Sequence, residues 1–291
     1  MLKKIRVIVA LLFAAIATLL FLDYTGTVHA YLGWCAKIQF VPAVLALIPA
    51  FFAVNIVIVV GLLLITLLFG RVYCSAVCPL GIFQDAVSWK AGWFKKGRFS
   101  YRPPKTAFVA ARFVLLGIFV AAVLLAAIFN TPPLAALIEP YSAYGRMVAQ
   151  LFTPLYKYGN NILAYFSERA GNYSFYTVNV WLTGVGAFVV AVLTFVTVSV
   201  FAWKSGRGYC NTICPAGAAL AVISKFSIVK HRIDKNKCVN CGVCIKNCKA
   251  GCIDPVNKDI DYLRCVSCFN CIDCCSKKAM KYTTLANMKK K

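Results

Sequence analysis

The sequence GRVYCSAVCPLG at residues 70–81 recurs as GRGYCNTICPAG at residues 206–217. Both copies follow the pattern G-R-x-Y-C-x-x-x-C-P-x-G, and each comes directly after a long apolar run. A cysteine pair that returns at the same place after 136 residues indicates a shared chemical role. We therefore expect two related halves, each of which carries this motif where an apolar segment ends.

The composition is that of an integral membrane protein with a soluble part. Of the 291 residues, 61% are hydrophobic and 14% are charged, whereas soluble proteins have about 45–50% and about 25%. The formal net charge is +23, and the basic residues flank apolar runs and fill the C-terminal third. A cytoplasmic excess of Lys and Arg explains this placement. Nucleic-acid binding is not expected, because the sequence contains no recognition motif for it.

Four apolar stretches are expected to cross a lipid membrane, which takes about 20 residues each. They lie at about residues 5–22, 51–69, 107–129 and 178–202. A cleaved signal peptide is the alternative interpretation of the first stretch.

The distribution of Lys and Arg predicts the orientation of these spans. The loop 71–106 holds seven and the tail after the fourth span holds seventeen, whereas loops 23–40 and 130–177 hold one and three. Both termini and the loop 71–106 are therefore expected in the cytoplasm. The aromatic-rich loop 130–177 is expected to form short helices on the outer surface. Arg112, near the basic end of the third span, is expected to reach outward to the interface.

The region 230–291 contains two further cysteine runs. CVNCGVCIKNC at 238–248 and CVSCFNCIDCC at 265–275 share the spacing C-x-x-C-x-x-C-x-x-x-C at an offset of 27 residues. Bacterial ferredoxins with two 4Fe–4S clusters have this spacing, and the fourth cysteine of each run ligates the other cluster. The sequence thus predicts a mainly α membrane protein. Residues 1–229 form a four-helix transmembrane domain of two repeated helix pairs, and a small cytoplasmic α+β domain like a two-cluster ferredoxin follows.

The spacing assigns eight cysteines to two 4Fe–4S clusters. The first set is Cys238, Cys241, Cys244 and Cys275, and the second set is Cys265, Cys268, Cys271 and Cys248. Zinc is the alternative, but zinc takes four ligands in pairs, and two runs of three plus one fit clusters better. The proline that commonly follows the fourth cysteine is replaced by Lys249 and Ser276. The local turn is therefore expected to differ from the usual one.

Three cysteines lie outside these sets and outside the two motifs. Cys252, which follows the first run, corresponds to Ala279, which follows the second run, and is expected to be a small buried residue. Cys274 corresponds to Asn247 and is expected to be a spare thiol. For both, a role as a ligand or a redox-active thiol is the alternative. Cys35 has no cysteine partner on the outer side and is expected to be structural.

The four motif cysteines, Cys74, Cys78, Cys210 and Cys214, are candidate metal ligands for a further iron–sulfur site. Cysteines four residues apart share one face of a helix, and the proline that follows ends or redirects the chain. If the halves pair around a pseudo-symmetry axis, all four thiols meet at the cytoplasmic face. The spacing leaves three alternatives open. The motifs hold one shared cluster, or they form two sites that each need an outside partner, or each helix end carries a pair of inert cysteines.

Four spans, two Y-C-x-x-x-C-P-x-G motifs and a C-terminal two-cluster ferredoxin together resemble the NapH/NosR-type membrane polyferredoxin family, over essentially the whole chain. The resemblance implies a multi-pass protein of the bacterial inner membrane. It further implies electron transfer between quinol or cytoplasmic donors and partners outside the membrane, such as a flavoprotein or a periplasmic reductase. The resemblance also implies that a quinone binds and that the protein has an activity like that of a quinol dehydrogenase. NosR-like members carry an outer flavin-binding domain that has no counterpart in this sequence.

Two classes of function are therefore expected. The first is a membrane electron conduit, and the alternative is an iron–sulfur redox sensor or maturation factor, for which the tail 277–291 offers no output domain. Haem is not expected, because the sequence has no C-x-x-C-H and its two histidines, His29 and His231, are predicted on opposite sides of the membrane. Nucleotide fingerprints of the Walker and Rossmann types are also absent.

Overall fold

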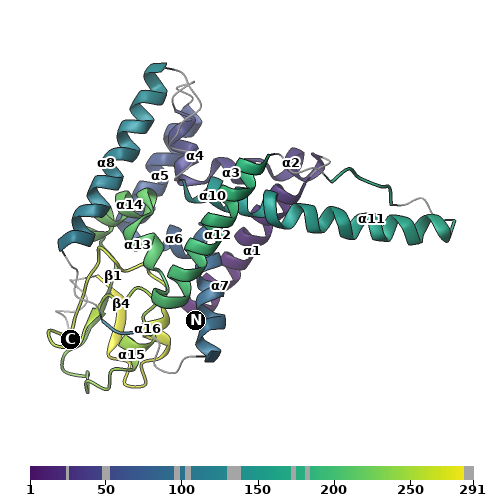
Figure 1. Cartoon of the computed structure of the whole chain (residues 1–291). Coiled ribbons are helices and arrows are strands. Elements are labelled where there is room, and N and C mark those ends of the chain that lie inside the picture. The colour runs from purple at the N-terminus through teal and green to yellow at the C-terminus, as the bar shows by residue number, and fades with distance from the viewer. Residues whose placement is uncertain are drawn as a thin grey trace.

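The computed structural model describes residues 1–23, 26–47, 53–94, 99–101, 106–129, 139–171, 175–180 and 184–284. The described chain is mostly helical, and its strands β1 to β4 all lie in the C-terminal part (Figure 1). The first half contains α1 (Leu2–Leu22), α2 (Thr27–Leu32), α3 (Trp34–Lys37), α4 (Phe40–Leu45), α5 (Ala53–Phe69), α6 (Val72–Ala76), α7 (Pro79–Phe94) and α8 (Thr106–Phe129). The second contains α10 (Pro140–Met147), the π-helical turn η1 (Val148–Phe152), α11 (Thr153–Arg169), α12 (Val185–Ser205), α13 (Gly208–Thr212) and α14 (Pro215–Lys225).

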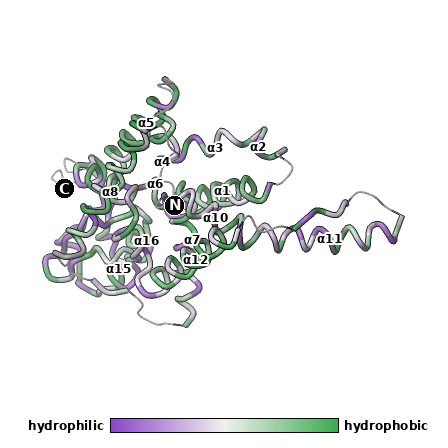
Figure 2. Tube along the Cα trace, turned by 45° about the horizontal axis from the view of Figure 1, so that its top comes forward, coloured by the Kyte–Doolittle hydropathy of each residue, from purple (hydrophilic) through white to green (hydrophobic). Residues whose placement is uncertain are grey.

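Each of the four apolar stretches forms a helix, namely α1, α5, α8 and α12. By length and composition, α1 and α12 are the described helices that could cross a membrane, and shorter apolar helices lie at Val54–Phe69 and Val109–Leu125. Large apolar side chains are exposed along these helices, as Leu11, Val57 and Leu193 illustrate, and Figure 2 shows their hydrophobic character. Exposed apolar surface of this extent marks contact with lipid or with another protein.

The helix α12 begins at Val185, later than the predicted residue 178. The side chain of Asn161 in α11 accepts a hydrogen bond from the backbone N–H of Val178 at 2.8 Å and donates one to its carbonyl at 2.9 Å. These backbone groups are therefore bonded to α11, and Val178 is extended instead of helical. The helix α11 itself projects away from the other helices (Figure 1).

The helices α7 and α14, which follow the two motifs, occupy corresponding places. α7 packs against α1 and α12, whereas α14 packs against α8 and α5. If α1 and α5 are the long helices that precede the first motif and α8 and α12 those that precede the second, then α7 and α14 each contact the first long helix of their own repeat and the second long helix of the other repeat. This exchange brings the two motifs together in the middle of the molecule, where both tyrosines and Cys74, Cys78 and Cys214 belong to one buried cluster.

The C-terminal part is a small α+β unit. β1 (Lys230–Ile233) pairs antiparallel with β4 (Met280–Thr283), and β2 (Ile253–Asp254) pairs antiparallel with β3 (Asp259–Ile260). The cysteine runs form loops that lead into the short helices α15 (Val243–Lys246) and α16 (Asn270–Asp273). At corresponding positions the loops have positive φ angles, 55° at Asn240 and 49° at Ser267, then 71° at Gly242 and 61° at Phe269. Both loops thus turn in the same way, as the repeated spacing predicts.

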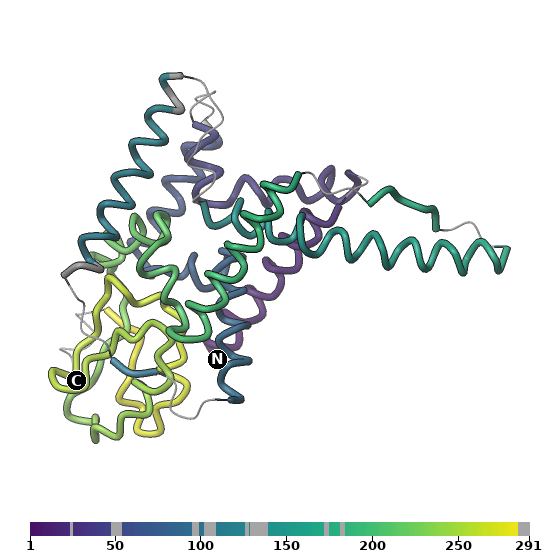
Figure 3. Tube along the Cα trace, viewed as in Figure 1, coloured from purple at the N-terminus to yellow at the C-terminus, as the bar shows by residue number. Residues whose placement is uncertain are grey.

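The C-terminal unit is fixed to the helical part through the end of α5. Backbone N–H groups of Ile228 and Val229 donate to carbonyl groups of α5 at 2.9 Å, and the Tyr282 hydroxyl donates to the Phe69 carbonyl at 2.6 Å. Near the N-terminus, the ammonium of Lys3 lies 2.6 Å from the Asp273 carboxylate. Figure 3 shows the start of the chain beside this unit.

Candidate metal centres

The second cysteine of each motif lies between two helices. α6 ends at Ala76 and α7 begins at Pro79; in the other motif, Cys214 has an extended backbone with a ψ of 117°. A residue before proline is sterically driven out of the α region, and proline is favoured in the first turn of a new helix. The prediction that both cysteines of a motif share one helix face is therefore wrong. The break aims each second cysteine at the start of the next helix.

The last glycine of each motif is required by close packing. A Cβ atom at Gly81 would collide with the Cys74 carbonyl, and one at Gly217 would collide with the Cys210 carbonyl. The backbone N–H of Gly217 also donates to the Cys214 sulfur at 3.3 Å. The chain therefore folds back closely enough for the helix start to contact both cysteines of its own motif.

The arginines of the two motifs cross to the opposite motif. Arg207 donates to the Cys74 carbonyl at 2.6 Å, and Arg71 donates to the Cys210 carbonyl at 3.4 Å. Both side chains are completely buried. Each arginine therefore fixes the first cysteine of the other half, which explains why the pair G-R stands in both copies. The crossing makes the two motifs one site.

The four motif cysteines, Cys74, Cys78, Cys210 and Cys214, are brought together as predicted, and each is only 4–5% exposed. Burial raises the pKa of Cys78, and repulsion from the neighbouring thiolates of Cys210 and Cys74 adds to the increase. Burial and the same kind of repulsion hold the pKa of Cys214 well above its usual value. The Gln84 side-chain amide donates to the Cys210 sulfur at 3.2 Å. A metal bound here would deprotonate the cysteines that ligate it.

Asp85 of α7 binds three cations beside this site. Its carboxylate lies 2.7 Å from Arg6, 2.9 Å from Arg207 and 3.2 Å from Lys249. Burial would raise the pKa of Asp85, but the charges of Arg207 and Lys249 outweigh burial and bring the pKa well below its ordinary value. The corresponding position of the second half is occupied by Ala221. The neutralising carboxylate is therefore present for only one of the two motif arginines.

Arg71 and Arg112 are buried on the other side of the site. Arg112 donates to the carbonyls of Gly217 at 2.7 Å and Leu263 at 3.0 Å, so the prediction that it reaches outward is wrong. Arg71 donates to the same Leu263 carbonyl and to the Asn211 side chain. Among the described residues, neither guanidinium forms an ion pair with a carboxylate. Because buried charges are normally paired, the surroundings of the four thiols suit a group with negative charge.

The C-terminal unit lies directly against this site. Besides the two bonds to Leu263, the Asn211 amide donates to the Arg264 carbonyl at 3.2 Å, and the Ser75 hydroxyl donates to the Ser267 carbonyl at 3.4 Å. The backbone N–H of Arg207 also donates to the Lys249 carbonyl at 2.9 Å. The second cysteine run and the residue after Cys248 thus touch the motifs themselves.

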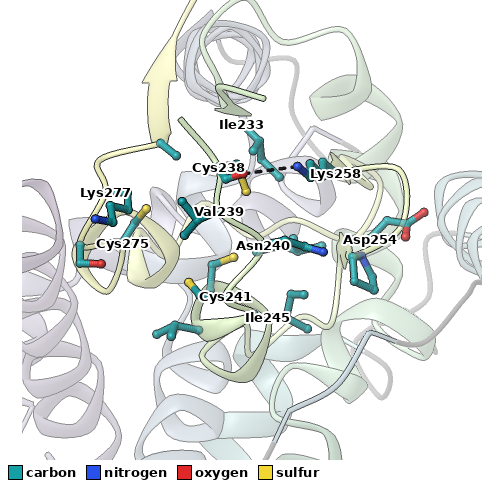
Figure 4. A pocket seen from close by; sticks show the side chains of 17 residues that line it. Ile233, Cys238, Val239, Asn240, Cys241, Ile245, Asp254, Lys258, Cys275 and Lys277 are labelled. Atoms are coloured by element: carbon teal, nitrogen blue, oxygen red, sulfur yellow. Dashed lines mark hydrogen bonds between the residues drawn. The ribbon is translucent and has the colours of Figure 1, made fainter. Parts of the chain in front are cut away.

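The first predicted ligand set of the C-terminal unit lines one cavity. Cys238, Cys241, Cys244 and Cys275 surround a space of about 520 Å³, which includes its open mouth. Figure 4 shows Cys238, Cys241 and Cys275 around this space, with the Lys258 ammonium directed at the Cys238 carbonyl, 3.3 Å away. Cys241 is exposed and the three others are half-buried. This cavity therefore communicates with solvent.

The second predicted set lines another, smaller cavity of about 340 Å³. Its lining includes Cys248, Cys265, Cys268 and Cys271, together with Cys252 and His231. Burial raises the pKa of Cys268 to about 11. Sequence reasoning placed Cys252 correctly as a buried residue, but it missed that Cys252 and His231 enter this cavity. The offset of 27 residues relates Cys252 and His231 to Ala279 and Lys258, which line the first cavity.

The donor sets suit iron–sulfur clusters. Each cavity is lined by the four cysteines that the spacing assigns to it, with Cys252 in addition in the second. The motif site offers four buried thiols beside guanidinium groups, of which Arg71 and Arg112 form no ion pair among the described residues. Within the part of the chain that the structure describes, no three His, Cys, Asp or Glu side chains converge on a point that could hold a single metal ion. The ligand assignments themselves stay predictions.

A known family matches the two halves that contain the motifs. The model of a 4Fe-4S binding domain matches residues 43–98 and again residues 180–236. The first match contains Cys74 and Cys78, and the second contains Cys210 and Cys214. The match thus lies on the two motifs and outside the C-terminal cysteine runs.

Several curated proteins are similar to this chain. The methylamine utilization ferredoxin-type protein MauN of Paracoccus denitrificans is 26% identical over 197 residues, which cover 65% of this chain and 53% of MauN. The putative electron transport protein YccM of Escherichia coli is 24% identical over 206 residues, 69% of this chain and 47% of YccM. An uncharacterized protein of Methanocaldococcus jannaschii is 30% identical over 83 residues, 28% of this chain and 33% of that protein. The chain thus spans about half the length of MauN and YccM and a third of the archaeal protein. No solved structure matches it.

Proposed function

We propose that this chain, an iron–sulfur protein of the ferredoxin-type electron-transfer family, carries electrons across the junction between its C-terminal unit and its helical part. Iron–sulfur clusters supply one-electron storage, and the protein's task is to position them and to tune their potentials. In the proposal, the two cavities of the C-terminal unit and the four-cysteine motif site each hold one cluster. The two motif halves then form a four-helix membrane domain with pseudo-twofold symmetry, as the packing of α7 and α14 suggests.

The observation that carries the proposal is the chain of buried contacts between the second cavity and the motif site. Cys248, a member of the second set, is followed by Lys249, which binds both Asp85 and the backbone of Arg207. Arg207 in turn donates to the carbonyl of Cys74 in the motif site. A continuous, buried set of contacts therefore joins the second cavity to the four motif thiols. Such packing keeps two redox centres at a fixed and short separation.

A location in the bacterial inner membrane, with both termini in the cytoplasm, agrees with these contacts. The ion pair between Lys3 and Asp273 requires the start of α1 and the C-terminal unit to be on the same side. The apolar helices α1 and α12 and the basic loops support the same arrangement. Electrons would then be exchanged with a cytoplasmic partner at the exposed cavity, and with a quinone, a flavoprotein or a periplasmic reductase at the membrane side.

Glu139 favours a quinone among these partners. It is 2% exposed, its Oε2 accepts a hydrogen bond from Ser142, and its Oε1 has no partner among the described residues. Burial raises the pKa of Glu139 to about 7. Its charge acts on Tyr73, which precedes Cys74 in the motif. A carboxyl group with this pKa exchanges protons near neutral pH, as quinol oxidation and quinone reduction require. The variant E139Q is expected to slow quinone-linked turnover while iron content stays unchanged.

The conduit is tested by rapid reduction of the full chain, purified anaerobically in detergent. After mixing with reduced viologen, the spectral change of the C-terminal clusters is expected before that of the motif site. In the variant C241S, which alters the exposed cavity, the motif site is expected to be reduced more slowly than in the unaltered chain. Equal rates in both proteins, or a protein that binds no iron, would contradict the proposed function.

A further inference from the structure

Many residues that line the two cavities of the C-terminal unit correspond to one another at the offset of 27 residues. Some corresponding positions carry different side chains, and two of these differences place another side chain next to the sulfurs of the predicted ligands. Cys252 lines the second cavity where the first cavity has Ala279, and His231 lines the second cavity where the first has Lys258.

Cys252 brings a fifth thiol to the second cavity. It is 2% exposed, and its sulfur lies 3.5 Å from the sulfur of Cys248. It is also hydrogen-bonded to the thiol of Cys265. Cys252 can therefore donate its S–H to the sulfur atoms of two predicted ligands.

His231 adds a second donor on the same side of the cavity. Its Nδ1 lies 3.9 Å from the Cys265 sulfur, within the range of hydrogen bonds to sulfur, and it donates in the tautomer that carries the proton on Nδ1. The ring is packed between Phe269 and Tyr282, with centroid separations of 5.1 and 5.0 Å. In the first cavity the counterpart Lys258 donates to the carbonyl of Cys238 instead of a sulfur. Among the described residues, the sulfurs of the second cavity thus meet two side-chain donors, Cys252 and His231, that have no counterpart at the sulfurs of the first cavity.

We propose that Cys252 and His231 are positioning residues that raise the reduction potential of the group held by Cys248, Cys265, Cys268 and Cys271. The potential of this group then exceeds that of the group held by the first set. The inference rests on the proposed function, because it presupposes clusters in both cavities. Hydrogen bonds to the sulfurs are among the factors that set cluster potentials. A donor stabilises the reduced state most, since that state carries one more negative charge on the same sulfurs.

The unequal potentials give the conduit a direction. The first cavity is open to solvent, whereas the second contacts the motif site through Lys249 and Ser267. When one electron leaves the first group and one arrives at the second, the charge is balanced and no proton has to move. Electrons that enter at the exposed cavity are therefore drawn toward the membrane side. The chain is thus suited to taking electrons from a low-potential cytoplasmic donor.

The test is a redox titration followed by EPR on the full chain, with the two midpoint potentials assigned by the C241S variant. In C252A, the equilibrium constant for one-electron reduction of the second group is expected to fall about tenfold. Its midpoint potential is therefore expected to fall by about 59 mV. The first group is expected to stay unchanged. The reciprocal variant A279C, which adds a thiol to the first cavity, is expected to raise the midpoint of the first group.

His231 is tested by two variants that separate packing from hydrogen bonding. H231F keeps an aromatic ring between Phe269 and Tyr282 but removes the donor, so the second midpoint is expected to fall. H231Q keeps an N–H donor and is expected to restore part of the loss. If His231 had only a structural role, H231F and H231Q would not differ in the midpoint potential of the second group.

The outcomes separate this inference from the proposed function. If both clusters are present and C252A leaves both midpoints unchanged, the inference is wrong and the function stands. If C252A loses about four irons per chain, Cys252 is itself a ligand and the inference is also wrong. A chain without iron would overturn the inference together with the proposed function.

Discussion

The motif site and the cavities of the C-terminal unit use the same ligand chemistry in opposite surroundings. The four motif thiols are buried among helices and lie beside the buried guanidinium groups of Arg71, Arg112 and Arg207. The cavity of the first set is open, with Cys241 exposed to solvent. Within the described residues, the lysine beside this cavity, Lys258, donates to the backbone carbonyl of Cys238. The difference concerns how the charge of a cluster is balanced.

A buried site cannot rely on water to stabilise charge. Fixed cations near the ligands replace water there, and their effect is large because the effective dielectric constant is low. An open cavity has solvent available and needs fewer fixed charges. We therefore expect the motif site to tolerate the loss of a charged neighbour poorly, whereas the C-terminal unit tolerates similar changes on its surface.

The largest loss of stability is expected from D85N. This change leaves the buried cation Arg207 without its carboxylate, and breaking a buried pair on one side costs about 3–5 kcal/mol of unfolding free energy. The midpoint of unfolding in detergent measures it. The control is D273N, which removes the exposed ion pair with Lys3 and is expected to leave the unfolding midpoint nearly unchanged, because solvent screens this pair. Equal losses in the two variants would contradict the contrast between the buried and open regions.

An intermediate effect is expected from G81A and G217A. In either variant the added methyl group meets a cysteine carbonyl of the same motif, and overpacking of this kind costs about 1–3 kcal/mol. G61A is the control, because a Cβ atom at Gly61 in the apolar helix α5 meets nothing within 4 Å. Unfolding of the three variants under identical conditions checks the difference. If G61A were as destabilised as G81A, close packing at the motif would not explain why the two copies share the same spacing of glycine and cysteine.

The smallest effect concerns access and leaves the folded structure unchanged. A chelator added under mild oxidation is expected to remove iron from the cavity of Cys241 first, then from the second cavity, and last from the buried motif site. The exposure of the cysteines decreases in this order. Iron release followed over time by EPR gives the sequence of losses. Simultaneous loss of all signals would show that burial does not protect the motif site.

The sequence predicted the local chemistry well and the tertiary contacts poorly. The spacing of the C-terminal runs placed two sets of four cysteines that the fold gathers around two cavities. Spacing suffices there because three cysteines of each set lie within one short loop. The meeting of the two motifs was also expected, from the repeat and the apolar runs that precede it.

The residues that surround the motif site were not predictable in this way. An arginine near the end of an apolar helix, such as Arg112, has the same local pattern whether it reaches the interface or turns inward. Only the carbonyls of Gly217 and Leu263, supplied by distant parts of the chain, decide between the two. The helix break at Cys78 is different, because the proline that follows it is a signal in the sequence. The proline was expected to end or redirect the chain, but both cysteines of the motif were still placed on one helix face. The isolated acid of a basic loop, Asp85, likewise acquires its role only through three distant cations.

The most direct test of the central claim is the amount of iron and acid-labile sulfide per chain, measured on anaerobically purified protein with and without the changes C74S and C210S. Three clusters predict about twelve irons in the unaltered chain and about eight in the double variant, with the EPR signals of the C-terminal unit retained. About eight irons in both proteins would contradict the claim that the paired motifs bind a cluster.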